Sequence, residues 1–61
     1  MKTPGGDKVT CIYKEKKIRN ATWTLTLLES GKKAIFMNSK LQRIFKDYDE
    51  AMNMFEIYTT K

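Results

Sequence analysis

Threonine alternates with large apolar residues in the middle of the chain, through Thr22, Trp23, Thr24, Leu25, Thr26 and Leu27. A period of two is the pattern of a β-strand, because successive side chains of a strand point to opposite faces. We predict a strand over residues 18–28. The face that builds the core holds Trp23, Leu25 and Leu27. The opposite face holds Thr22, Thr24, Thr26 and Leu28.

Apolar and polar positions on either side predict two further strands. Residues 9–13 alternate, and the polar run 14–17 (Lys-Glu-Lys-Lys) predicts a turn. The sequence Glu-Ser-Gly-Lys at 29–32 predicts a hairpin into a strand that is apolar at each position from Ala34 to Met37.

Two registers are open for this hairpin. A two-residue loop pairs Leu25 with Phe36, whereas a three-residue loop with Gly31 in the left-handed conformation pairs Leu25 with Ile35 and Trp23 with Met37. Gly at the last loop position favours the second register. In either one, the threonine face gains large apolar side chains, either Phe36 or Ile35 with Met37. A face that only met water would not need them.

The end of the chain predicts a helix. After a turn at Asn38-Ser39 and a fourth extended segment over 41–46, Asp47 is placed as the N-cap, and Glu50 completes an acidic capping box. An apolar stripe then follows at helical spacing, while Asn53 and Glu56 are expected to point away from the core. The stripe consists of Ala51, Met54, Phe55 and Tyr58, with Tyr48 at its edge.

These elements predict an α+β fold: a three- to four-stranded antiparallel β-meander with one C-terminal α-helix packed on one face. Residues 1–7, with Pro4-Gly5-Gly6, are expected to form a flexible N-terminus, and residues 8–61 a single small domain. A chain of 61 residues buries only about 60% of its unfolded surface. A core of this size contributes roughly 3–5 kcal/mol of stability.

Composition limits the chemistry that the chain can perform. The chain has no histidine and a single cysteine, Cys11, so neither a zinc site nor an internal disulfide is expected, and we predict no catalytic residue, metal or cofactor. Cys11 lies in an apolar alternation and is predicted to be a small buried hydrophobe. An unpaired cysteine, with neither a signal-peptide pattern nor a membrane-spanning stretch, favours the cytoplasm and excludes a membrane partner.

Charge is distributed unevenly around a formal net value of +5. Residues 14–46 hold nine basic and two acidic side chains, whereas residues 47–61 hold four acidic side chains and one basic one. A basic body of this kind is typical of proteins that bind polyanions. Lysine is more frequent than arginine, which favours contacts with phosphates over specific reading of bases.

The main functional hypothesis is therefore a small, non-enzymatic nucleic-acid-binding regulatory protein. Threonine hydroxyls on the sheet face and basic side chains around it would contact the phosphate backbone of DNA or RNA. The predicted contact residues are Lys14, Lys16, Lys17, Arg19, Thr22, Thr24, Thr26, Lys32, Lys33 and Arg43.

The last strand and the helix start also support this hypothesis by resemblance. The string FKDYDEA at 45–51, after a strand with Trp23 and a Gly31-Lys32 turn, is similar to the arm-type DNA-binding domains of phage integrases. The hybrid-binding domain at the N-terminus of some RNase H enzymes has a comparable ending. The resemblance covers roughly residues 18–58 and implies three strands, a C-terminal helix and nucleic-acid binding through the sheet side.

A protein-interaction module is the alternative hypothesis. Strands that are apolar on two faces suit docking onto a larger host protein, which the chain would regulate or inhibit, or formation of a homodimer. The predicted interface residues are Leu28, Ile35, Phe36 and Met37. The lysine-rich, histidine-free composition is typical of phage or mobile-element proteins.

Overall fold

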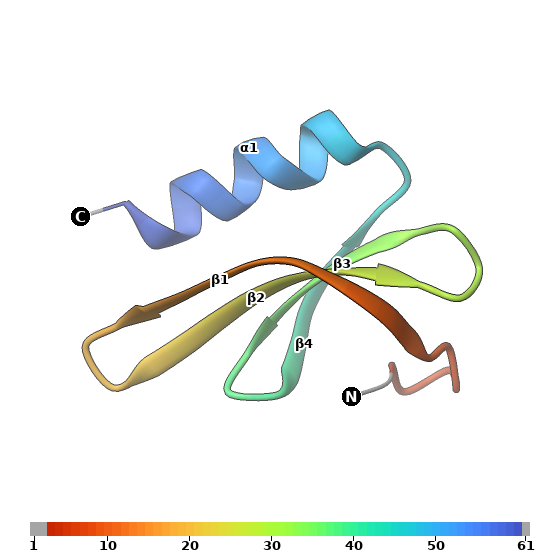
Figure 1. Cartoon of the computed structure of the whole chain (residues 1–61), viewed down its shortest axis with the longest axis horizontal. Helices are drawn as coiled ribbons and strands as arrows, with labels where there is room; N and C mark the ends of the chain where they lie inside the picture. Colours follow the sequence, from red (N-terminus) through yellow and green to blue (C-terminus); the bar gives the residue numbers. More distant parts are fainter. Residues whose placement is uncertain (1–2, 61) are drawn as a thin grey trace.

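The computed structural model describes residues 3–60, which form one antiparallel sheet and one helix. The elements in chain order are β1 (Val9–Ile18), β2 (Ala21–Leu28), β3 (Lys33–Met37), β4 (Lys40–Phe45) and α1 (Tyr48–Thr59). The strands are arranged in the order β1-β2-β3-β4, and α1 lies along one side of the sheet (Figure 1). The predicted α+β meander with a C-terminal helix is confirmed. Within this part of the chain, nothing helical has the length and the apolar character that crossing a membrane requires.

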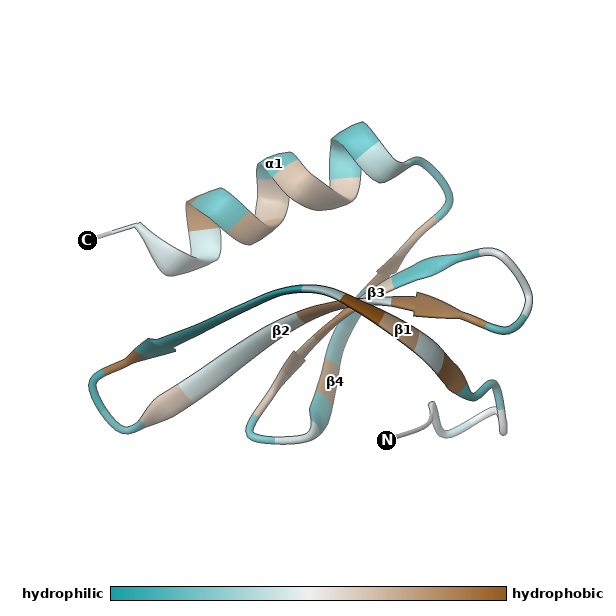
Figure 2. Ribbon diagram, in the orientation of Figure 1, coloured by the Kyte–Doolittle hydropathy of each residue, from teal (hydrophilic) through white to brown (hydrophobic). Residues whose placement is uncertain are grey.

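The first strand is longer than the sequence predicted, because the polar run 14–17 is not a turn. β1 continues to Ile18, and Glu15 and Lys17 pair with Thr24 and Thr22 of β2. The turn is instead formed by Arg19-Asn20, so β2 begins at Ala21 and not at residue 18. β1 is an edge strand with one side open to water, where charged side chains are well tolerated. Figure 2 shows the change along β1 from an apolar first half to a hydrophilic second half.

The hairpin between β2 and β3 has the register of the three-residue loop. Leu25 pairs with Ile35 and Trp23 with Met37. Gly31 has a φ of 96°, a left-handed conformation that glycine adopts without steric cost, and its N–H donates to the carbonyl of Leu28 at 2.9 Å. The bulged form that the sequence favoured is therefore confirmed.

Helix α1 and the sheet enclose the main core. Leu25 and Ile35, paired across β2 and β3, pack with Phe45 of β4 and with the helix residues Ala51 and Phe55, and all five are buried. Trp23, Met52, Met54 and Tyr58 pack around this cluster and are partly buried. The predicted helical stripe therefore faces the sheet. Leu27, which was also assigned to the core, is only half-buried.

The opposite face of the sheet has a second, smaller core, which corrects the prediction of an accessible face. Leu28, Ala34 and Phe36 form a buried cluster there, and Val9 and Leu41 pack against it from the two edge strands. The register shifts within β1 and between β3 and β4 explain this closure. Bulges increase the local twist of a strand, so the strand ends curl over this face.

The bulges in β1 also explain why Cys11 is exposed and not buried as predicted. Along β1, the residues that have a partner in β2 pass from Val9 directly to Cys11 and from Ile12 directly to Lys14. One residue of β1 is therefore left out of the register at each step. Each skipped residue changes the face on which the following side chains lie. The simple alternation of residues 9–13 therefore does not continue in space.

The start of α1 is at the predicted residue but lacks the predicted capping bond. Asp47 has the extended backbone of an N-cap (φ −104°, ψ 133°), yet its side chain makes no capping hydrogen bond. The acidic side chains of Asp49 and Glu50 lie in the first turn, where the positive end of the helix dipole favours them. The helix is thus stabilised at its start by charge and by packing of Ala51, whose N–H donates to the carbonyl of Asp47 at 3.0 Å.

Residues 3–7 form a hydrogen-bonded turn next to the loop between β2 and β3. The N–H of Thr3 donates to the carbonyl of Asp7 at 2.9 Å, and the N–H of Asp7 donates to the hydroxyl of Thr3 at 3.1 Å. The Asp7 carboxylate accepts hydrogen bonds from the N–H and the hydroxyl of Ser30. Part of the segment predicted to be flexible is thereby connected to the sheet, and residues 1–2 lie outside the described residues.

Candidate nucleic-acid interface

The predicted contact residues are divided between the two ends of the sheet. In a meander, successive turns lie at alternate ends. The turns Arg19-Asn20 and Asn38-Ser39 therefore lie at the same end of the sheet, and residues of both turns line one groove together with Tyr58 from the last turn of α1. We call this the groove end. Lys32, in the loop between β2 and β3, and Lys33, the first residue of β3, lie at the other end.

Several predicted residues are not accessible at all. Thr24 and Thr26 expose 4% and 0% of their surface, and the Thr26 hydroxyl donates to the carbonyl of Ala34 at 3.1 Å. Their predicted role in contacting phosphates is therefore wrong, because the second core covers them. The same burial applies to three of the predicted protein-interface residues, Leu28, Ile35 and Phe36. Met37, the fourth, is half-buried and lies on the helix side of the sheet together with Ile35.

Two predicted contact residues, Lys14 and Lys16, are engaged by the helix. Their Nζ atoms lie 2.7 Å and 3.3 Å from the carboxylate oxygens of Glu56. The hydrogen bond from Lys14, the bond from Lys16 and their positive charges lower the pKa of Glu56. Glu56 therefore faces β1, which corrects the prediction that it points away. These ion pairs join α1 to β1 and leave the two lysines less available to an anion.

Two other basic residues that were predicted to contact nucleic acid interact with groups of the protein itself. Lys33 donates from Nζ to the carbonyl of Gly31 at 3.0 Å, and the Arg43 guanidinium lies over the ring of Phe45, 5.2 Å from its centre. Lys17 and Arg19, by contrast, are exposed at the groove end. Thr22, which pairs with Lys17, lies beside them and is partly accessible.

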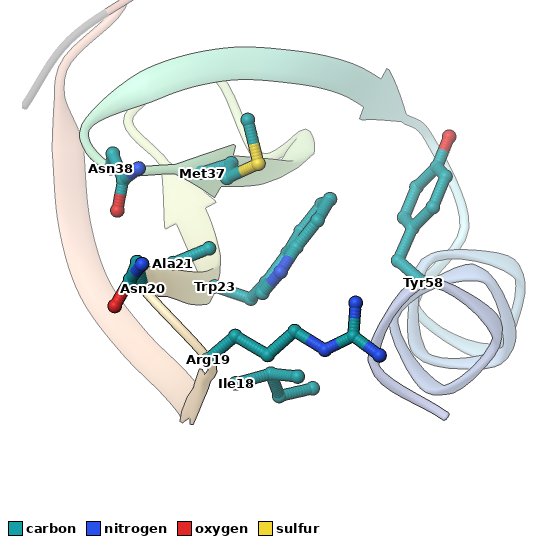
Figure 3. A pocket seen from close by; sticks show the side chains of 8 residues that line it. All are labelled: Ile18, Arg19, Asn20, Ala21, Trp23, Met37, Asn38 and Tyr58. Atoms are coloured by element: carbon teal, nitrogen blue, oxygen red, sulfur yellow. The ribbon is translucent and has the colours of Figure 1, made fainter. Parts of the chain in front are cut away.

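A groove of about 510 Å³ lies at the groove end, between the two turns and the end of α1 (Figure 3). Its volume is within the roughly 300–1,000 Å³ that is typical of ligand sites. It is lined by Ile18, Arg19, Asn20, Ala21, Trp23, Met37, Asn38 and Tyr58. None of these lining residues, all within the described part of the chain, carries a carboxylate or a thiol.

Two aromatic rings form one wall of the groove. Trp23 of β2 and Tyr58 of α1 stack with ring centres 5.3 Å apart and an angle of 16° between their planes. Both residues are only half-buried, so the pair closes the main core and also presents aromatic surface to the groove. The sequence prediction assigned both to the core and missed this second role.

Hydrogen bonds between β2 and the turn that joins β3 to β4 fix the shape of the groove. The N–H of Asn38 donates to the carbonyl of Thr22, and the N–H of Thr22 donates to Oδ1 of Asn38, both at 2.9 Å. Asn38 and Ser39 have φ values of 52° and 70°, as in a type I′ turn, where asparagine is favoured. The asparagine that makes the tight turn therefore also holds a groove-lining side chain in place.

Arg19 lines the groove from the other turn, in a backbone conformation that is unfavourable for it. Its φ is 58°, and the left-handed region costs an L-residue with a Cβ roughly 1–2 kcal/mol. Its side chain extends from the turn across the groove toward the helix (Figure 3). Glycine would fit the backbone better, so the arginine at this position indicates a role for its side chain.

Two exposed lysines lie at this end of the sheet. Lys40 pairs with Met37 directly after the second turn, on the helix side, whereas Lys17 pairs with Thr22 next to the first turn, on the face away from α1. With Arg19, they place three positive charges at this end of the sheet, and Arg19 and Lys40 lie on the side of the groove, whose lining has no acidic side chain. An anion that approaches this end of the sheet therefore meets cations first, and aromatic surface behind them.

Comparison of the chain with models of protein families, with curated proteins and with solved structures gives no match.

Proposed function

We propose that this chain binds nucleic acid, without catalysing a reaction, through the basic side chains at the groove end. The observation that carries the proposal is the groove itself, with Arg19 in its lining, Lys40 on the same side of the sheet and Lys17 at the same end on the other face. Basic side chains around a concave surface neutralise phosphates and release counterions, which is the main source of sequence-independent affinity for nucleic acids. The proposal keeps the function that the sequence favoured but moves it from the sheet face to one end of the sheet.

The proposed binding is directed mainly at the backbone of the nucleic acid. Lysine is a point charge that contacts phosphate without reading bases, and the groove has one arginine and two asparagines, Asn20 and Asn38, as further polar groups. We therefore expect weak sequence selectivity. The lack of acidic side chains and thiols in the lining supports a binding site over a catalytic one. The single, exposed Cys11 supports our proposal that the protein acts in the cytoplasm.

The test compares charge reversal at the two ends of the sheet. Lys17→Glu with Lys40→Glu removes two cations at the groove end, whereas Lys8→Glu with Lys32→Glu makes the same change in net charge at the other end. All four side chains are exposed, so both double variants should fold. We expect only the first double variant to lose binding to a mixed-sequence oligonucleotide.

Salt dependence gives a second readout of the same proposal. About three phosphate contacts should give a plot of log affinity against log salt with a slope of about −2 for a single strand. Equal loss in both double variants would show attraction by net charge alone and would contradict a site at the groove end. Absence of any binding at low salt would contradict the proposed function altogether.

Docking to a protein is a second candidate, which a separate observation favours. Ile12, Thr26, Ala34 and Ile44 are neighbours across all four strands on the face opposite the helix. Thr26 and Ala34 are buried, but Ile12 and Ile44 expose 51% and 39% of their surface. Sedimentation equilibrium tests whether this row joins two copies. A dimer that Ile12→Ser with Ile44→Ser dissociates would support it, and a monomer at all concentrations would contradict it.

A further inference from the structure

We infer that the groove takes a single-stranded nucleic acid and stacks one of its bases against the Trp23 and Tyr58 wall. This inference rests on the proposed function and specifies its substrate class. Single-strand sites combine a positive groove that follows the backbone with aromatic side chains on which bases stack. Both components are present here within one groove.

The aromatic wall has the geometry that stacking requires. The rings of Trp23 and Tyr58 are within 16° of parallel and stack on each other, so a planar base can extend the stack by lying on the outer face of one of them. Arg19 enters the same groove from the turn and brings a planar cation that stacks on bases and binds phosphate (Figure 3). Such a site accepts any of the bases, because every base has an aromatic face.

Charge determines which way the strand lies. The last turn of α1 carries no basic residue, and the negative end of the helix dipole lies near Tyr58. Glu56 adds a carboxylate on the same side, where Lys14 and Lys16 already pair with it. Phosphates should therefore follow the Arg19 and Lys40 side, and the base should point toward the helix.

A duplex does not satisfy this arrangement. The aromatic wall lines a groove between two turns and the helix. The bases of a duplex are already paired and stacked on one another, so they offer no free face to this wall. An unpaired strand can turn a base outward onto an aromatic side chain, as single-stranded regions do in RNA recognition. The groove thus favours a single strand over a duplex, whereas phosphate contacts alone would not distinguish the two.

The chain provides its own reporter for the test, since Trp23 is its one tryptophan. A base stacked on the indole quenches its fluorescence. We propose titrating the full chain with three probes of equal length: an oligothymidylate, an abasic oligomer with the same phosphates, and a hairpin duplex. The expected result is quenching by the oligothymidylate, with affinity about tenfold or more above that of the abasic oligomer and the duplex.

A matched pair of variants separates stacking from folding. Tyr58→Leu removes half of the wall but keeps an apolar side chain against the core and leaves Trp23 as reporter. Tyr13→Leu is the control, because Tyr13 packs edge-on against Tyr48 at the start of the helix, away from the groove. Tyr58→Leu should reduce affinity for the oligothymidylate about tenfold and leave affinity for the abasic oligomer unchanged.

The outcomes distinguish this inference from the proposed function. Equal affinity for the oligothymidylate and the abasic oligomer, without quenching, would overturn base stacking while phosphate binding stands. Tighter binding of the hairpin duplex would likewise overturn the single-strand inference alone. If no probe binds at low salt, the proposed function fails as well. Quenching by an uncharged aromatic peptide, but by no oligonucleotide, would assign the groove to a protein partner and overturn both.

Discussion

Replacing Arg19 by glycine should make the protein more stable and less able to bind. Arg19 is the first residue of the two-residue turn between β1 and β2, and its φ of 58° lies in the left-handed region. Glycine adopts this conformation without steric cost, which recovers roughly 1–2 kcal/mol. The greater freedom of glycine in the unfolded chain costs about 0.4–1 kcal/mol. Because the arginine side chain is exposed, its removal should cost little packing.

The net gain is therefore about 0.5–1 kcal/mol, which raises the melting temperature of a domain this small by about 2–8 °C. Binding should change in the opposite direction. A hydrogen bond to a charged group contributes roughly 1.5–3 kcal/mol, so loss of the guanidinium should weaken binding to a single-stranded oligonucleotide about tenfold or more.

Thermal unfolding followed by circular dichroism and an oligonucleotide titration measure the two effects on the same protein. Arg19→Lys is the matched control, because it keeps both the charge and the unfavourable backbone. It should melt with the wild type and lose only part of the affinity. A glycine variant that is less stable than the wild type would refute the strain argument, and one that binds equally well would refute the role of the arginine.

Three further substitutions test other parts of the structure. Phe36→Ala should leave the chain largely unfolded by circular dichroism, because truncating a buried phenylalanine costs roughly 3–5 kcal/mol, as much as a core of this size contributes; a folded variant would show that the second core is dispensable. Thr26→Val, which removes a buried hydroxyl, should change stability by no more than about 1 kcal/mol and leave oligonucleotide affinity unchanged, whereas lost affinity would restore the threonine face as the contact surface. Glu56→Gln frees Lys14 and Lys16 and should tighten binding about two- to fivefold at low salt, and an unchanged or weaker affinity would contradict competition by Glu56. Lys14 and Lys16 lower the pKa of Glu56 below its ordinary 4.5, so the stability that these ion pairs give is present above pH 4.5 and is lost as the pH falls through the lowered pKa. The stabilities of wild type and Glu56→Gln should therefore differ above about pH 4.5 and converge at lower pH.

The sequence predicted the fold well where local signals and burial agree. The alternation around Leu25, the glycine of the β2–β3 loop and the helical stripe with Phe55 each appear in the structure as expected. It failed along β1, because bulges depend on how two strands pair and leave no clear mark in one of them. Cys11 was misplaced for that reason, whereas the lysine run was taken for a turn because the tolerance of an edge strand for charge depends on the strand order.

The candidate site was predicted only in part. Lys17 and Arg19 were identified from charge, but charge cannot tell which cations share one end of the sheet. The groove combines Trp23 and Tyr58, 35 positions apart in sequence, and only the packing of α1 brings them together. Asn38 gave a local signal for a turn, and its place at the groove follows from the meander order.

Mapping of backbone amide shifts by NMR, during titration with a short oligothymidylate, would locate the binding surface without relying on any variant. Binding at the groove end predicts that the largest shifts fall on residues 17–23, 37–40 and 58, with the salt dependence of a phosphate contact. Shifts confined to the row of Ile12, Thr26, Ala34 and Ile44, or spread evenly over all lysines, would contradict a nucleic-acid site at this end of the sheet.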